Sequence, residues 1–190
     1  MPANNWVGVL TSSQIDSTAL TNSTTATTII PTAARFTLPN SFFDVIGKTI
    51  HIQAQGRIST VVTTPGTLTF SVRFGTGPVI VATSGALALN IVAKTNVAWT
   101  LEWLLTCRAI GGGTTANLMH NGTFSSEAVI GSPVPGTGGS GSLALVASAA
   151  AVGTGFDSTA AQIVDLFGTW SVANAANSIL THQYYLKALN

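Results

Sequence analysis

The acidic residues are the first candidates for chemistry, and the sequence holds six of them: Asp16, Asp44, Glu102, Glu127, Asp157 and Asp165. Hydrolysis of a glycosidic bond needs two carboxyl groups that face each other across the substrate, and Asp157 and Asp165 are the only near pair. Asp165 alternates with apolar neighbours in QIVDLF, and Asp157 begins a turn in GFDSTA. No G-x-S-x-G elbow offers a serine nucleophile. We therefore expect neither a catalytic carboxylate pair nor an enzyme.

The histidines and the single cysteine are the other reactive groups. His51, His120 and His182 fall on separate expected strands, without the close spacing of a metal-binding motif, and each is expected to be an isolated, exposed strand residue. Cys107 excludes an internal disulfide, and it shares the strand parity of Trp99 and Trp103, which predicts a buried thiol. We expect no metal ion and no cofactor.

The composition limits the kinds of partner. Only 7% of the residues are charged and the net charge is +1, against about 25% charged residues in an ordinary soluble domain. The seven Lys and Arg residues are scattered singly, which argues against nucleic acid because phosphate binding needs clustered cations. The longest apolar run, residues 143–152, is about half the length of a membrane-spanning helix. No basic residue precedes an apolar core at the N-terminus, so no secretory signal is expected.

Alternating apolar residues predict β-strands along most of the chain. Leu68, Phe70, Val72 and Phe74 alternate with Thr69, Ser71 and Arg73, and the longest alternating run extends from Val97 to Cys107. The expected strands lie within 34–39, 47–60, 64–75, 78–83, 86–92, 96–108, 116–124, 126–131, 143–149, 161–170 and 178–189, with 116–124 and 126–131 paired across a short turn. This pattern predicts an all-β fold, a single antiparallel β-sandwich of about eight to ten strands, jelly-roll-like. An immunoglobulin-like sandwich is the alternative.

The N-terminal residues differ from the rest. We expect residues 1–30, rich in Ser and Thr, to form an extended arm or an edge strand, and residues 31–190 to form the sandwich domain. The short apolar stretch WVGVL places Trp6, Val7, Val9 and Leu10 as candidate partner contacts. They pack either on their own sandwich or on another chain.

The exposed positions of the expected strands are small and uncharged. The chain contains 28 Thr and 17 Ser, and such side chains lose little entropy or hydration when another protein covers them. Interface cores are depleted in charge. The composition therefore predicts a protein packed against copies of itself or a larger assembly.

Several phrases of the sequence resemble small structural proteins of tailed-bacteriophage virions: AARFTLPNSFFDVIGKTIHIQAQGRISTVVTTPGTLTFSVRFG, LEWLLTCRAIGGGTT, GFDSTAAQIVDLFGTW and HQYYLKALN. Within that group the chain looks most like capsid decoration (cement) proteins. The resemblance implies a β-rich homo-oligomer, often a trimer, that forms in the host cytoplasm. It would bind the major capsid protein on the outside of the shell and stabilise the assembled particle. It implies no catalytic residues.

Two other functions remain open. A tail fibre, spike or baseplate module that binds a host-surface glycan would need a groove with exposed aromatic and amide or carboxylate groups. Tyr184, Tyr185, His182 and Gln183 are the one cluster that could supply them, although a closing strand with one tyrosine ring inward and one outward is also expected. A polymer hydrolase would need Asp157 and Asp165.

Overall fold

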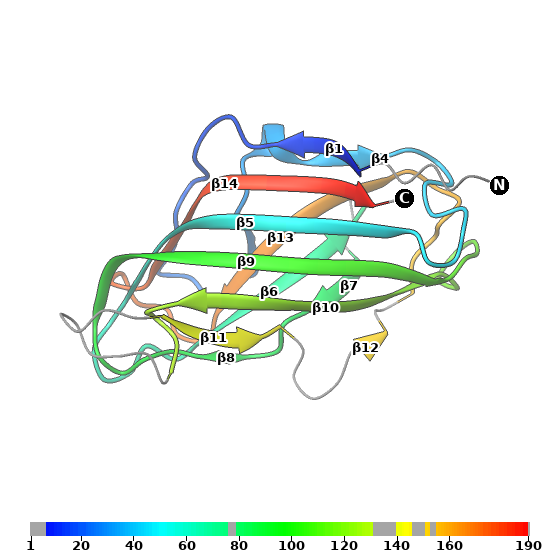
Figure 1. Ribbon diagram of the computed structural model, residues 1–190. Coiled ribbons are helices and arrows are strands. Elements are labelled where there is room, and N and C mark those ends of the chain that lie inside the picture. The colour runs from blue at the N-terminus through cyan, green and yellow to red at the C-terminus, as the bar shows by residue number, and fades with distance from the viewer. Residues whose placement is uncertain (1–6, 76–78, 131–139, 146–150, 153–154, 190) are drawn as a thin grey trace.

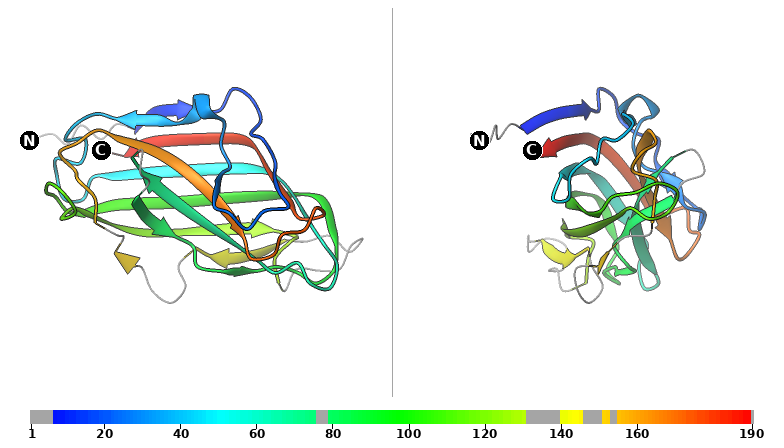
Figure 2. Two further views of the ribbon diagram at one scale, coloured as in Figure 1. Left: turned by 180° about the vertical axis from the view of Figure 1, so that it is seen from behind. Right: turned by 90° about the vertical axis from the view of Figure 1, so that its right-hand side faces the viewer.

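Two antiparallel β-sheets lie face to face and contain most of the chain (Figures 1 and 2). The computed structural model describes residues 7–75, 79–130, 140–145, 151–152 and 155–189. The eight-stranded sheet contains β1 (Val7–Ser12), β2 (Leu20–Thr21), β5 (Thr49–Thr60), β9 (Lys94–Ala109), β10 (Asn117–Ser126), β11 (Gly141–Ala144), β12 (Ala151–Val152) and β14 (Ser178–Leu189). The six-stranded sheet contains β3 (Thr27–Thr28), β4 (Phe36–Leu38), β6 (Thr67–Phe74), β7 (Val79–Thr83), β8 (Leu87–Ala88) and β13 (Gln162–Trp170).

The order of the strands confirms the predicted jelly-roll type of sandwich. One sheet is built on the order β1-β14-β5-β9, and in the other β4 and β6 pair with β13 while β7 pairs with β6. The chain crosses between the sheets from β4 to β5, from β5 to β6, from β7 to β9 and from β13 to β14, as in a double Greek key. β10 and β11 extend the first sheet beyond β9. Within the described residues the one helix is a short 3-10 turn, Thr32–Ala34, and no helix there is long and apolar enough to cross a membrane.

The core lies between the sheets and takes one side chain from every second strand position. The predicted inward residues of β6 and those of β9 from Trp99 to Cys107 are fully buried, and so is Trp170 at the end of β13. Val97, near the start of β9, is partly buried. Aromatic rings from both sheets meet there: the centroid of Phe70 lies 5.0 Å from that of Phe124 and 6.2 Å from that of Trp99. Because the inward positions are fixed by this packing, the alternate positions must face outward.

One sequence prediction of the strands is wrong. Residues 116–131 were expected to form two strands, but β10 continues through Ser126, which lies opposite Trp99 of β9. The Ser126 hydroxyl donates to the Ala98 carbonyl at 2.9 Å and accepts from the Ala128 amide at 3.1 Å. The chain therefore turns only after Ser126, and of the expected second strand Val129 makes a single bridge to Leu89. Residue 131 lies outside the described residues.

Residues 7–30 lie along both sheets, and their first part takes the edge-strand form. β1 pairs with β14, from Val7 opposite Leu189 to Ser12 opposite Tyr185. β2 also pairs with β14, and β3 pairs with β13. Leu20, Ile29 and Ile30 are buried in the common core. Figure 2 shows β1 at the edge of the eight-stranded sheet beside β14 and the rest of this segment running behind that sheet, so the outer face of the sheet is open in Figure 1.

Candidate functional site

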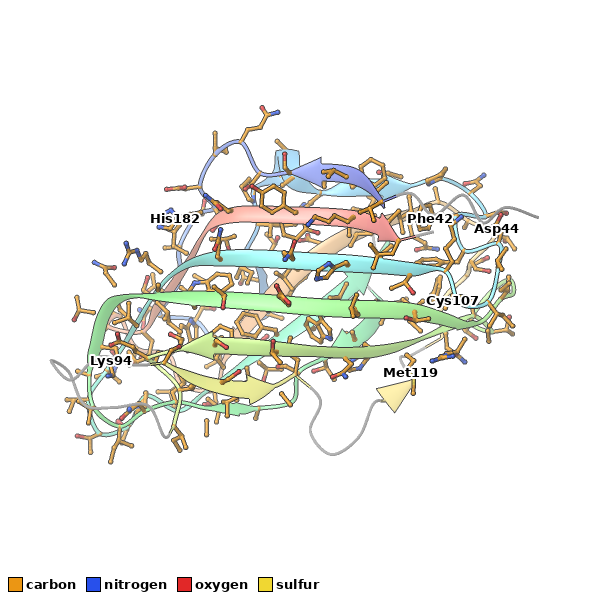
Figure 3. The ribbon with its side chains drawn as sticks, in the orientation of Figure 1. Phe42, Asp44, Lys94, Cys107, Met119 and His182 are labelled. Carbon is orange, nitrogen blue, oxygen red and sulfur yellow. The ribbon has the colours of Figure 1, made fainter. Side chains whose placement is uncertain are left out.

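The open outer face of the eight-stranded sheet carries three parallel rows of side chains across β14, β5, β9 and β10. The strand register defines them: the Tyr185 row is Tyr185, Gln53, Glu102 and Thr123; the Lys187 row is Lys187, His51, Leu104 and Asn121; the Gln183 row is Gln183, Gln55, Thr100 and Ser125. The rows contain mainly amides and hydroxyls, with one carboxylate and one ammonium group. Figure 3 shows this face toward the viewer.

A shallow groove lies between the Tyr185 row and the Gln183 row. Its volume is about 130 Å³, and its exposed lining is Gln53, Gln55, Thr100, Glu102, Gln183 and Tyr185. We call it the Tyr185 groove. It crosses β14, β5 and β9, so three strands far apart in the sequence contribute to it.

Hydrogen bonds between side chains on neighbouring strands fix the amides of this groove. The Gln53 amide donates to Glu102 Oε1 at 3.0 Å and accepts from Lys187 Nζ at 2.5 Å, and the Gln55 amide donates to Gln183 Oε1. The second carboxylate oxygen of Glu102 and the Gln183 amide NH₂ make no hydrogen bond within the described residues. These groups are therefore oriented and still able to bind a polar ligand.

The two tyrosines point in opposite directions, as the sequence predicts. Tyr184 is fully buried, and burial raises the pKa of its hydroxyl well above the usual value. Tyr185 is 38% exposed, and Lys187 Nζ lies 5.8 Å from the centroid of its ring. Of the cluster named from the sequence, Tyr185 and Gln183 lie in the groove, whereas Tyr184 belongs to the core and His182 does not line the groove.

A bulge in β14 explains why Gln183 and Tyr185 face outward. Thr181 lies opposite Gly56 and Gln183 lies opposite Gln55, so His182 is an extra residue in β14. The inward positions are therefore odd-numbered before the bulge (Ile179, Thr181) and even-numbered after it (Tyr184, Leu186). Without the extra residue, the next inward position after Thr181 would be 183.

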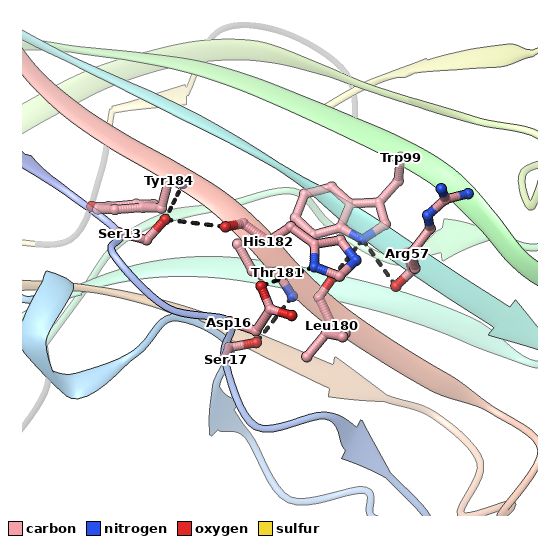
Figure 4. A network of polar contacts seen from close by, with 9 residues as sticks. All are labelled: Ser13, Asp16, Ser17, Arg57, Trp99, Leu180, Thr181, His182 and Tyr184. Carbon is pink, nitrogen blue, oxygen red and sulfur yellow. Dashed lines mark hydrogen bonds and ion pairs between the residues drawn. The ribbon is translucent and has the colours of Figure 1, made fainter.

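The segment after β1 holds this bulge in place (Figure 4). Ser13 Oγ donates to the His182 carbonyl at 3.3 Å and accepts from the Tyr184 amide at 2.9 Å. Ser17 Oγ accepts from the Thr181 amide at 2.9 Å, and Asp16 Oδ1 lies 3.0 Å from His182 Nδ1. His182 therefore serves the attachment of this segment to β14.

Glycine is required opposite the bulge. A Cβ on Gly56 would lie 1.9 Å from the carbonyl oxygen of Leu180, too close for any side chain to fit without movement of the backbone. The absence of a side chain at Gly56 therefore lets β5 and β14 approach each other where the bulge interrupts the regular pairing.

The N-terminal partner-contact candidates are divided. Trp6 lies outside the described residues. Val7 and Val9 of β1 are 64% and 60% exposed and lie opposite Leu189 and Lys187 of β14, while Leu10 packs against the core. Two of the four candidates, Val7 and Val9, are therefore exposed at the edge of the sheet.

The acidic pair that a hydrolase would need is held by other contacts. Asp165 is buried, its Oδ2 lies 2.7 Å from Arg35 Nε, and its Oδ1 accepts from Thr28 at 2.6 Å. Burial raises the pKa of Asp165. Asp157 is half-buried and accepts from the amide and hydroxyl of Thr159, which lower its pKa. Each carboxylate has a local structural partner, and no acid faces the other across a groove.

The remaining reactive groups are also separate. Cys107 is buried, as predicted, and burial raises the pKa of its thiol. The expectation of an exposed His120 is wrong: it is buried and accepts from Trp103 Nε1 at 3.3 Å, because its position in β10 faces inward with Leu118 and Phe124. Among the described residues, no group of three or more His, Cys, Asp and Glu side chains is arranged to hold a metal ion.

Sequence reasoning did not identify Gln53, Gln55 and Glu102 as members of a site. Their outward direction follows from the alternation of each strand, which is visible in the sequence. Their proximity to Tyr185 depends on the order β14-β5-β9 and its register, which local patterns do not determine.

Comparisons with known proteins give little further information. No protein-family model matches the chain, and no curated protein matches it. One solved structure that resembles it is the CBM2 module of the evolved Dit of Lactobacillus casei BL23 phage J-1, with 11% sequence identity over 98% of this chain and 97% of that chain and a TM-score of 0.38. At these values the likeness assigns neither family nor function.

Proposed function

We propose that this protein is a non-enzymatic structural component of a tailed-bacteriophage particle and that its eight-stranded sheet face binds a host-surface saccharide. The resemblance of the sequence to virion proteins supports the first part. The Tyr185 groove supports the second, because an exposed aromatic ring there adjoins amides and a carboxylate that are already oriented. It is the kind of groove that the glycan-binding alternative requires.

The chemistry of the groove matches the surface of a sugar. A sugar ring has apolar C–H faces, which pack on an aromatic side chain, and a rim of hydroxyls, which donate and accept hydrogen bonds. Tyr185 offers the ring, and Gln53, Gln183 and Glu102 offer paired donors and acceptors. A few oriented polar groups beside an apolar surface are typical of small-molecule sites.

The charge of the groove favours an uncharged ligand. Glu102 and Lys187 have opposite charges, and both hydrogen-bond Gln53. A polyanion would bring its charges toward the Glu102 carboxylate without a cluster of cations in compensation.

Isothermal titration calorimetry with uncharged oligosaccharides tests this function. The panel contains malto-, cello- and N-acetylchito-oligosaccharides, from monosaccharide to hexasaccharide. We expect Tyr185→Ala to lower the affinity for the bound saccharide by about tenfold, equivalent to ~1.4 kcal/mol. The control is Phe167→Ala, which removes an aromatic ring from the opposite sheet and should leave the affinity unchanged. Failure of the wild type to bind any member of the panel contradicts saccharide binding.

Capsid decoration is the second candidate function, and the edge strand β1 is the observation that favours it. Its outward Val7 and Val9 are largely exposed, and the strand VGVLTS contains no charge and no proline to block pairing with another chain. In this function β1 contacts a neighbouring copy in a trimer or the major capsid protein on the capsid exterior.

Light scattering and co-sedimentation with isolated phage capsids test this candidate. It predicts a particle of three 19.4 kDa chains and capsid binding that Val9→Glu abolishes while saccharide affinity is retained. A wild-type monomer that does not sediment with capsids contradicts it.

A further inference from the structure

A second groove adjoins the first on the same sheet face. Its volume is about 260 Å³, and its lining includes His51, Glu102, Leu104, Asn121 and Thr123. We call it the Asn121 groove. Glu102 lines both grooves, so they meet at one carboxylate.

The register of the sheet places the two grooves next to each other along one diagonal strip, on either side of Glu102. The Tyr185 groove lies over β14, β5 and β9, and the Asn121 groove lies over β5, β9 and β10. Neighbouring strands lie about 4.8 Å apart, so the strip from β14 to β10 is about 14 Å long. This length exceeds that of one sugar ring, so a monosaccharide would contact only one of the two grooves.

The polar groups of the Asn121 groove are available to a ligand. Within the described part of the chain, the side chains of His51, Asn121 and Thr123 make no hydrogen bond to another residue. Burial lowers the pKa of His51, so its imidazole is neutral at neutral pH and offers one donor and one acceptor. Leu104 is 43% exposed between these groups and offers an apolar surface to a C–H face.

Glu102 connects the two grooves chemically as well as in space. One of its oxygens accepts from Gln53, and the other makes no hydrogen bond within the described residues. A hydroxyl at the junction can donate to this free oxygen. An anionic group at the same place would be repelled by the carboxylate.

We propose that the two grooves form one binding strip for an uncharged oligosaccharide chain, with Tyr185 and Asn121 in different subsites and Glu102 between them. This inference rests on the proposed saccharide binding and adds the extent, direction and charge of the ligand. The chain lies across the strands rather than along them.

The proposed strip is tested by measuring, with the same calorimetric panel, how affinity depends on the length of the saccharide chain. We expect the affinity of the wild type to rise from the shortest bound saccharide to longer chains of the same series and then to become constant. Asn121→Ala and Thr123→Ala should each lower the affinity for the longer chains by about fivefold to tenfold, and leave that for the shortest bound saccharide unchanged. Thr69→Ala is the matched control for Thr123→Ala, because Thr69 lies at an outward position of β6 in the other sheet.

Two results would overturn the inference separately from the proposed function. In the first, the wild type binds short and long chains with equal affinity, that affinity depends on Tyr185, and Asn121→Ala has no effect. The saccharide then binds in the Tyr185 groove alone, and the proposed strip is wrong. If oligogalacturonate, an anionic chain, binds more tightly than the uncharged chains, the assignment of ligand charge fails. Absence of all saccharide binding overturns the proposed function itself. Denaturant unfolding of each variant is the control that checks whether the fold is retained.

Discussion

The polar side chains on the outer faces of the two sheets differ in how far they are paired within the chain. On the six-stranded sheet, Asp165 is buried between Arg35 and Thr28, and Arg73 lies over the Phe167 ring with its guanidinium carbon 4.4 Å from the centroid. On the eight-stranded sheet, amides and hydroxyls stand in open rows, and several retain unused donors and acceptors. The polar groups of the six-stranded sheet stabilise the fold, whereas those of the eight-stranded sheet are available to a ligand. Substitutions on the first face should therefore change stability, and those on the second should change binding.

The largest effect should come from Arg35→Ala. It removes the closest cation from the buried Asp165 carboxylate and leaves it the Thr28 hydroxyl and the Leu166 backbone amide. Because the Arg35 side chain is 32% exposed, we expect a loss of about 2 kcal/mol, less than for a fully buried ion pair. Urea unfolding at neutral pH measures the loss. Glu102→Ala removes an acceptor from the open face and should change stability by less than about 0.5 kcal/mol. Equal losses for the two variants would show that the faces do not differ in this way.

Replacement of one cation on each face should give crossed effects. Arg73→Ala removes the contact with Phe167 and should lower the free energy of unfolding by about 1 kcal/mol, with saccharide affinity unchanged. Lys187→Ala frees the Gln53 amide that it orients, and should lower affinity about threefold with little change in stability. Calorimetry and urea unfolding on both variants check this, and a binding loss in Arg73→Ala would contradict it.

The pH dependence of stability should show the smallest of these differences. Burial raises the pKa of Asp165 above the value of 3.8 expected in the unfolded chain. Between pH 3.8 and the raised pKa, Asp165 therefore holds its proton more tightly in the folded than in the unfolded protein. The contribution of Asp165 to stability therefore falls as pH rises from 3.8 through the raised pKa. Asp165→Asn should remove this fall, as urea unfolding across the acidic range would show.

Asp157 is the matched control for the direction of this pH dependence. Hydrogen bonds from Thr159 lower its pKa, so its contribution is present above pH 3.8 and is lost as pH falls through the lowered pKa. The differences between wild type and the Asp165→Asn and Asp157→Asn variants should thus slope in opposite directions. Slopes of the same sign would mean that burial does not raise the pKa of Asp165.

Much of the fold could be predicted from the sequence, because alternation reports directly on packing. The inward residues of β6 and β9, the buried Cys107 and the opposed tyrosines all follow from a period of two residues. The end of β10 could not be predicted, because the hydroxyl of Ser126 is held by Ala98 of another strand. The inward direction of His120 could have been found, since it shares the parity of Leu118 and Phe124.

The candidate site was less predictable than the fold. Gln183 and Tyr185 could be named from the sequence, but their partners Gln53 and Glu102 lie on strands that only the sheet order brings together. The bulge at His182 sets which residues of β14 face outward, and it depends on contacts with Ser13 and Ser17 far away in the sequence.

The most direct test of the account is an NMR titration of the protein with the tightest-binding oligosaccharide of the calorimetric panel. Backbone amide shifts would be followed with increasing ligand. The account predicts that the perturbed amides lie on β14, β5, β9 and β10 along the strip from Gln183 and Tyr185 to Asn121 and Thr123, with β6 and β13 unchanged. Perturbations centred on Arg73 and Phe167, or at the ends of the sandwich, would contradict it.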